Sequence, residues 1–150
     1  MNVVIGIGNE LRGDDGIGPR VVDAIEPRAN LITMTVHQLV PELAAKIQDA
    51  QRVLFVDASL NDELSLQQVE SSNHQGLGHA CSPAGLLSWT KLAYDKAPQS
   101  WLLSIPGFAF EFGESLSVQA AALLPEAMRR VESWLHDCPE PVLMMSEEEA

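Results

Sequence analysis

The sequence contains few basic residues. Nine Lys and Arg stand against 21 Asp and Glu in 150 residues, which gives a formal net charge of −12 at pH 7. An acidic surface repels phosphate backbones and anionic lipid headgroups. The charge balance therefore predicts no nucleic-acid partner and no binding to a membrane surface.

Cysteines and long apolar runs are also scarce. The two cysteines, Cys81 and Cys138, form no Cys-x-x-Cys pattern, which argues against a disulfide framework and against a zinc knuckle. No segment approaches the ~18 uninterrupted apolar residues of a membrane helix. No basic stretch followed by an apolar run opens the chain, as it would in a signal peptide. We therefore expect a cytoplasmic protein with no membrane span.

The length fits one domain followed by an acidic tail. From residue 137 the chain reads DCPEPVLMMSEEEA, with five acids and no base. Such a composition is typical of a mobile segment outside the core. The sequence thus predicts a domain over 1–136, in which sixteen acids face nine bases, and a tail over 137–150.

Apolar runs alternate with helical patterns before the tail. Runs rich in Val, Ile and Leu predict buried strands at 3–5, 31–36, 53–56 and 101–105, with a weaker strand at 66–69. Helix starts are indicated by Pro19, Pro41 and the pair Ser82-Pro83, while Pro125 marks either a start or a kink. The order β-α-β-α-β-β-α-β-α predicts an α/β three-layer sandwich, with a mainly parallel sheet flanked by helices.

The glycine-rich loop at 6–18 follows the first predicted strand, where open α/β sheets bind ligands. It does not fit a dinucleotide site, because Leu11 stands where the fingerprint needs its third glycine. No Lys followed by Ser or Thr makes it a phosphate-binding P-loop. Its acids, Glu10, Asp14 and Asp15, would moreover repel a pyrophosphate. A phosphate ligand is therefore not expected here.

Two acids and a histidine in such loops could instead bind a cation. Asp15, Asp57 and His79 offer two carboxylates and an imidazole, a set that suits nickel, zinc or a similar ion. Each residue also has an ordinary interpretation. Asp14 or Asp15 could cap the following helix, Asp57 could be a turn residue, and His79 a solvated loop residue. We favour the cation site because all three follow strands of one predicted crevice.

Several segments resemble the hydrogenase maturation endopeptidases, which trim the large subunit of [NiFe] hydrogenases. The residues that carry this resemblance are GIGNELRGDDGIGPRVV, VLFVDAS and HACSPAGLLSWTKLAY. HQLVPELA and GFAFEFGESLS resemble one branch of the family, and the likeness runs from about Val3 to about Trp134. One departure is that His37-Gln38-Leu39 replaces the Asp-Gly-Gly motif that some members carry after the second strand.

The resemblance implies an α/β protease without a Ser or Cys nucleophile and without an organic cofactor. Such an enzyme removes a C-terminal peptide from the precursor large subunit in the cytoplasm, after nickel insertion. It implies that Asp15 and Asp57 are catalytic, and that Asp15, Asp57 and His79 contact nickel supplied by the substrate. His79 matches the family's histidine better than His74 because the Ser-Pro helix start lies at the family's distance. His37 could transfer protons or pair with a carboxylate.

Two roles for nickel and two other functions remain open at this stage. Nickel could polarise the scissile carbonyl or lower the pKa of a water, or it could only position the peptide while a carboxylate acts as general base. A chaperone that checks for nickel and binds the precursor without cutting it would need the same residues. An unrelated small α/β ligand-binding domain would have no metal-dependent partner.

Overall fold

A five-stranded sheet forms the centre of the computed structural model, which describes residues 1–71 and 82–137. In spatial order the strands are β2 (Leu31–Val36), β1 (Asn2–Ile7), β3 (Arg52–Ser59), β5 (Gln99–Pro106) and β4 (Ser65–Val69). The first four are parallel, and only β4 runs antiparallel to its neighbour β5. The prediction of a mainly parallel sheet is confirmed.

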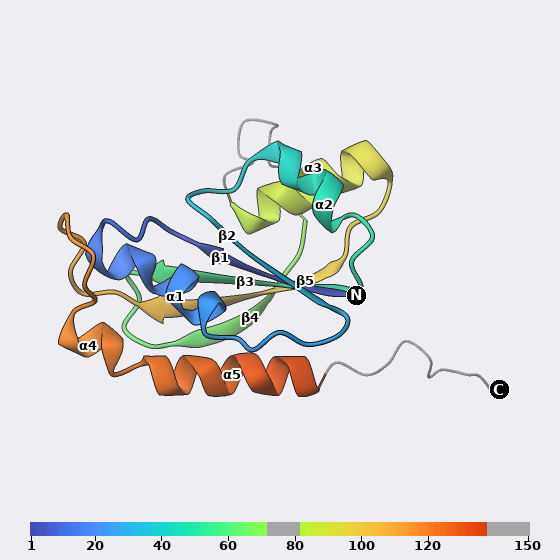
Figure 1. The fold of residues 1–150 in the computed structure, drawn as a ribbon. Helices are drawn as coiled ribbons and strands as arrows, with labels where there is room; N and C mark the ends of the chain where they lie inside the picture. Colours follow the sequence, from blue (N-terminus) through green and yellow to red (C-terminus); the bar gives the residue numbers. More distant parts are fainter. Residues whose placement is uncertain (72–81, 138–150) are drawn as a thin grey trace.

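Helices cover both faces of the sheet (Figure 1). One face carries α1 (Ile17–Asp23), α4 (Val118–Ala121) and α5 (Leu124–His136), and the other carries α2 (Ala44–Ile47) and α3 (Pro83–Tyr94). Each face has its own core of fully buried side chains, since Val4 of β1 packs with the first group, while Val3 and Ile5 pack with the second. The three-layer sandwich is therefore as predicted.

Helix starts follow local signals in two of the expected places. Ser82 caps α3, because its Oγ accepts a hydrogen bond from the Gly85 backbone N–H at 3.0 Å, and Pro83 is the first helical residue. Pro125 lies in the first turn of α5 and produces no kink. The helix expected after Pro41 is short, a 3-10 turn at Pro41–Leu43 that continues into α2.

The start of α1 differs from the prediction. The helix begins at Ile17, directly after a 3-10 turn, η1 (Gly13–Gly16), and two residues before Pro19. Proline is tolerated there because the backbone N–H groups of a first helical turn have no partner within the helix. The second half of the glycine-rich loop is therefore helical, although its glycine content does not predict this.

Close contact between α1 and the sheet depends on Gly18. A Cβ atom at this position would lie 2.4 Å from the Val56 carbonyl oxygen and 2.7 Å from that of Ile7. Only glycine allows so close an approach without a shift of the backbone. The contact fixes the loop after β1 over the carboxyl ends of β1 and β3.

Some residues singled out in the sequence lie outside the part of the chain that the structure describes. His79, together with His74 and Cys81, lies in the segment 72–81, and all but the first residue of the predicted tail lies in 138–150. The division into a domain over 1–136 and a tail therefore stays a prediction. Among the described residues, none of the helices is long and apolar enough to cross a membrane.

Candidate functional site

The carboxyl ends of β1, β3 and β5 form the edge at which the predicted site residues lie. Ile7 of β1 pairs with Asp57 of β3, and Asp57 pairs in turn with Ser104 of β5. The loop after β1, which carries Asp15, begins at this edge and returns to the sheet through α1. In Figure 1 this loop lies beside the segment that follows β5.

Asp15 is held by the turn that precedes α1. Its side chain is partly buried, and its Oδ2 accepts a hydrogen bond from the Asn9 backbone N–H at 2.8 Å. The tight path needs glycine at position 8, where φ is +149° and a Cβ atom would lie 1.8 Å from the Asp15 carbonyl oxygen. The Asp15 carboxylate is thus fixed in place but remains within reach of solvent.

Asp57 lies within β3 rather than after it, because the strand continues to Ser59. The pKa of Asp57 is raised to about 7, mainly because the carboxyl group is buried. A hydrogen bond from the Ala58 backbone N–H has the opposite effect and lowers this pKa, but it is outweighed. The negative charge of Asp15 raises this pKa further. The structure therefore brings the two predicted carboxylates close enough to repel each other.

Alternation along β3 gives the direction of the Asp57 side chain. Val53 and Phe55 pack in the core under α2 and α3, while Leu54 and Val56 pack on the opposite face. Asp57 continues the first series. It therefore points to the layer that contains α3, the helix that directly follows the undescribed segment with His79.

His37 lies at the same edge of the sheet. It directly follows β2, whose last residue, Val36, pairs with Ile7 and accepts a hydrogen bond from the Gly8 backbone N–H at 2.9 Å. Its side chain is exposed. A role in proton transfer stays a prediction.

Asp14 has a structural role that the sequence did not indicate. Its side chain is 0% exposed, and it accepts hydrogen bonds from the backbone N–H groups of Phe108, Ala109 and Ser117 and from the Ser117 hydroxyl, at 2.7–2.9 Å. Burial alone would raise the pKa of Asp14, but these four hydrogen bonds outweigh it and lower the pKa below its ordinary value. The interpretation of Asp14 as a helix cap is therefore wrong: its side chain caps neither η1 nor α1 but holds the segment 107–117.

Further hydrogen bonds join the loop after β1, and the helix α1 that follows it, to the segment 107–117. Gly13 N–H donates to the Gly113 carbonyl at 2.8 Å, and Gly113 N–H donates to the Leu11 carbonyl at 2.7 Å. The Arg20 guanidinium donates to the Glu114 carbonyl. The loop after β1 and the segment after β5 therefore form one rigid unit beside Asp15.

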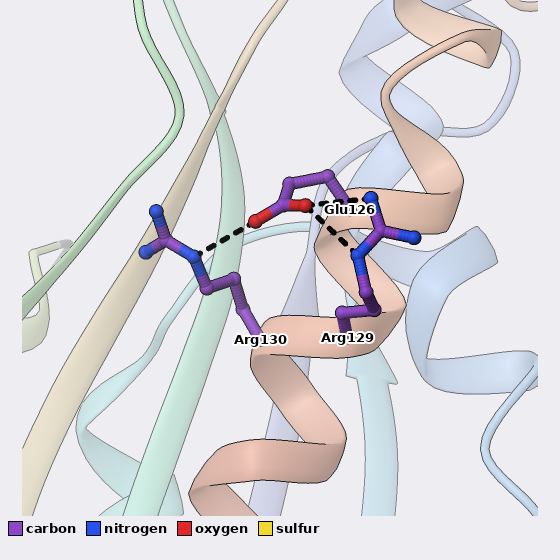
Figure 2. Close-up of polar contacts among 3 residues, drawn as sticks. All are labelled: Glu126, Arg129 and Arg130. Carbon is purple, nitrogen blue, oxygen red and sulfur yellow. Dashed lines mark hydrogen bonds and ion pairs between the residues drawn. The ribbon is translucent and has the colours of Figure 1, made fainter.

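The ion pairs among the described residues lie away from the two site carboxylates. On α5, Glu126 pairs with Arg129 at 2.7 Å and with Arg130 at 3.1 Å (Figure 2). The other ion pairs are Arg28–Glu132 and Lys96–Asp49. Within residues 1–71 and 82–137, no base forms an ion pair with Asp15 or Asp57. In these ranges an incoming cation therefore competes with no basic side chain for the two carboxylates, and its charge favours the ionised form of Asp57.

The described residues do not by themselves complete a metal site. Nowhere in 1–71 or 82–137 do three His, Cys, Asp or Glu side chains gather in a way that could hold an ion. The pair of carboxylates supplies two donors, and the predicted third donor, His79, lies outside these ranges.

The raised pKa of Asp57 predicts that stability falls as pH rises. Between the ordinary pKa of 3.8 and the folded value of about 7, the native state keeps a proton that the unfolded chain has lost. Asp57→Asn has no carboxyl group to titrate at this position. The free energy of unfolding of the variant, relative to that of the wild-type protein, should therefore increase by about 1–3 kcal/mol between about pH 5 and about pH 8. Urea unfolding at both pH values measures it. A gain that is equal at both would contradict the assigned burial of Asp57.

The fold matches solved structures of hydrogenase maturation endopeptidases. The hydrogenase maturating endopeptidase HybD from E. coli has a TM-score of 0.72 and 19% sequence identity, and the match covers 91% of this chain and 92% of that one. The hydrogenase 2 maturation peptidase from Thaumarchaeota archaeon SCGC_AB-539-E09 has a TM-score of 0.66 and 22% identity, over 89% and 97% of the two chains.

A third similar structure is the [NiFe] hydrogenase maturation protease HybD from Thermococcus kodakarensis, with a TM-score of 0.65, 20% identity and coverage of 89% and 97%. No protein-family model and no curated protein matches the sequence. The agreement is thus one of structure over nearly the whole length of each chain. The protein has the fold of the hydrogenase maturation endopeptidases.

Proposed function

We propose that this protein is a hydrogenase maturation endopeptidase, which removes the C-terminal peptide from the large-subunit precursor of a [NiFe] hydrogenase in the cytoplasm. The observation that carries the proposal is the pair Asp15 and Asp57. One carboxylate from the loop after β1 and one from β3 lie near each other at the carboxyl edge of the sheet, and no described base forms an ion pair with either. Similar solved structures named as maturation endopeptidases support the same activity.

Nickel enters this proposal as part of the substrate. The precursor presents the ion on its own ligands, and Asp15 and Asp57 each contribute a carboxylate oxygen. His79 adds an imidazole nitrogen, which completes a mixed set that suits a borderline ion such as nickel. A precursor without nickel cannot form these bonds and therefore binds more weakly. The enzyme selects the nickel-loaded precursor by this difference in affinity.

Cleavage then needs a water molecule and a group that accepts its proton. One carboxylate of the pair acts as general base on the water that attacks the scissile carbonyl, and it then gives that proton to the amine nitrogen as the C–N bond breaks. The substrate's nickel fixes the peptide over the two acids and draws electron density from the carbonyl. Neither step uses a Ser or Cys nucleophile.

The proposal is tested by the intact mass of the precursor. Incubation of the wild-type protein with nickel-loaded precursor should lower the precursor's mass by one C-terminal peptide in a single step. Mass spectrometry of both products identifies the cleaved bond. Stable association without a change of mass would instead indicate a chaperone that checks for nickel, and absence of both association and cleavage would contradict the proposal.

A further inference from the structure

Four large apolar side chains are exposed in the loops at the edge of the sheet that carries the two site carboxylates. Leu11 is 45% exposed, Leu60 85%, Phe108 52% and Phe112 81%. They come from the loops that follow β1, β3 and β5, three neighbouring strands of the sheet. We call these four residues the apolar rim. Exposed apolar groups that gather at one place on a soluble protein mark an interaction site.

Backbone hydrogen bonds bring the rim residues together. Gly113 N–H donates to the Leu11 carbonyl at 2.7 Å, which places Leu11 beside the neighbour of Phe112. Gly107 N–H donates to the Ser59 carbonyl at 2.9 Å, and these two residues directly precede Phe108 and Leu60. The loops that carry the four residues therefore lie together at one edge of the sheet (Figure 1).

The rim is held rigidly although its side chains are exposed. The buried carboxylate of Asp14 accepts hydrogen bonds from the backbone N–H groups of Phe108 and Ala109. Asp14 directly precedes the site residue Asp15. A surface whose backbone is fixed before binding loses little conformational entropy when a partner arrives. The same carboxylate thus couples the position of the rim to the position of the site.

Charge around the rim indicates the chemistry of its partner. The segments that carry the rim also carry the exposed acids Glu10, Asp62, Glu63, Glu111 and Glu114. In the same segments, 8–16, 60–64 and 107–117, Arg12 is the one base. A partner with apolar side chains and flanking positive charge complements this surface.

We propose that the apolar rim docks a segment of the precursor in which apolar residues are flanked by Lys or Arg, beside the bond to be cut. This inference rests on the proposed function and adds to it a second contact, which does not involve nickel. Docking places the scissile bond over Asp15 and Asp57. Binding energy from the rim therefore lowers KM, while kcat depends on the carboxylates that act at the scissile bond.

The double variant Phe108→Ala/Phe112→Ala tests the docking role. With the nickel-loaded precursor that the wild-type protein cleaves, KM should rise by about 10-fold, while kcat stays within about twofold. The matched control is Leu92→Ala, since Leu92 is 65% exposed on α3, outside the three loops. Its KM should equal that of wild type.

A charge reversal tests the chemistry of the partner. Glu111→Lys should raise KM by about 3- to 10-fold, whereas Glu42→Lys, an exposed acid on the turn before α2, should leave it unchanged. An unchanged KM in the Phe108/Phe112 variant, or a fall in kcat alone, would overturn the docking role while the proposed function stands. Failure of the wild-type protein to bind or cleave any precursor would overturn the proposed function itself, and this inference with it.

Discussion

Asp15→Asn and Asp57→Asn are each expected to slow precursor cleavage by at least about 100-fold while the protein stays folded. An amide keeps the size of the carboxylate but loses its charge, so it binds a cation weakly and accepts no proton from water. Either substitution leaves one acid of the pair in place. Because the two acids act on the same ion and the same water, we expect each single loss to be nearly as severe as the loss of both.

Folding of these variants is expected to be intact. The Asn9 N–H that donates to Asp15 at 2.8 Å finds an amide oxygen in the Asn variant, and Asp57→Asn removes a partly buried charge that destabilises the native state at neutral pH. The matched control is Asp23→Asn, an exposed acid at the end of α1, outside the loops that carry the site and the apolar rim. Cleavage rates, followed by intact mass, should distinguish the control from both site variants. A site variant that cleaves at the wild-type rate would remove that residue from the mechanism.

Asp14→Ala is expected to lower the free energy of unfolding by roughly 2–4 kcal/mol. The substitution leaves three backbone N–H groups and one hydroxyl without the carboxylate that they bind at 2.7–2.9 Å. Buried donors that lose a charged acceptor are costly because water does not fully replace it. The segment 107–117 should also become sensitive to protease, since Asp14 fixes both of its ends.

The comparison for this prediction is Asp23→Ala, an exposed acid at the end of α1. Chemical denaturation of both variants should show a large loss for Asp14 and a loss within about 0.5 kcal/mol for Asp23. Asp14→Asn should fall between them, because it keeps one acceptor oxygen. Equal stability of the Asp14 and Asp23 variants would contradict the anchoring role.

The layers of the fold could be predicted because local sequence signals agree with them. Val3, Val4 and Ile5 form a β-branched run before a glycine, as a doubly covered parallel strand requires, and Ser82-Pro83 supplies both the cap and the first residue of α3. Pro19 predicts a start of α1 that is two residues later than the observed one, Ile17. A proline is equally acceptable a little further into the first turn, so its position alone does not fix the boundary.

The approach of Asp15 to Asp57 followed from topology. Parallel strands deliver their carboxyl ends to one edge, so loops after β1 and β3 must meet there. The burial that raises the pKa of Asp57 depends on packing from all sides and was not predictable. The role of Asp14 was hidden for a different reason, because its partners lie 94 to 103 residues away along the chain. Nothing local distinguishes that aspartate from Asp15.

The most direct test of the central claim compares nickel-loaded and nickel-free precursor with the wild-type protein. Intact mass should show complete loss of the C-terminal peptide from the loaded precursor and no change in the nickel-free one. Addition of nickel to the free protein alone should not replace loading of the precursor, since the ion arrives on the substrate's ligands. Equal cleavage of both precursors would contradict recognition of nickel by Asp15 and Asp57.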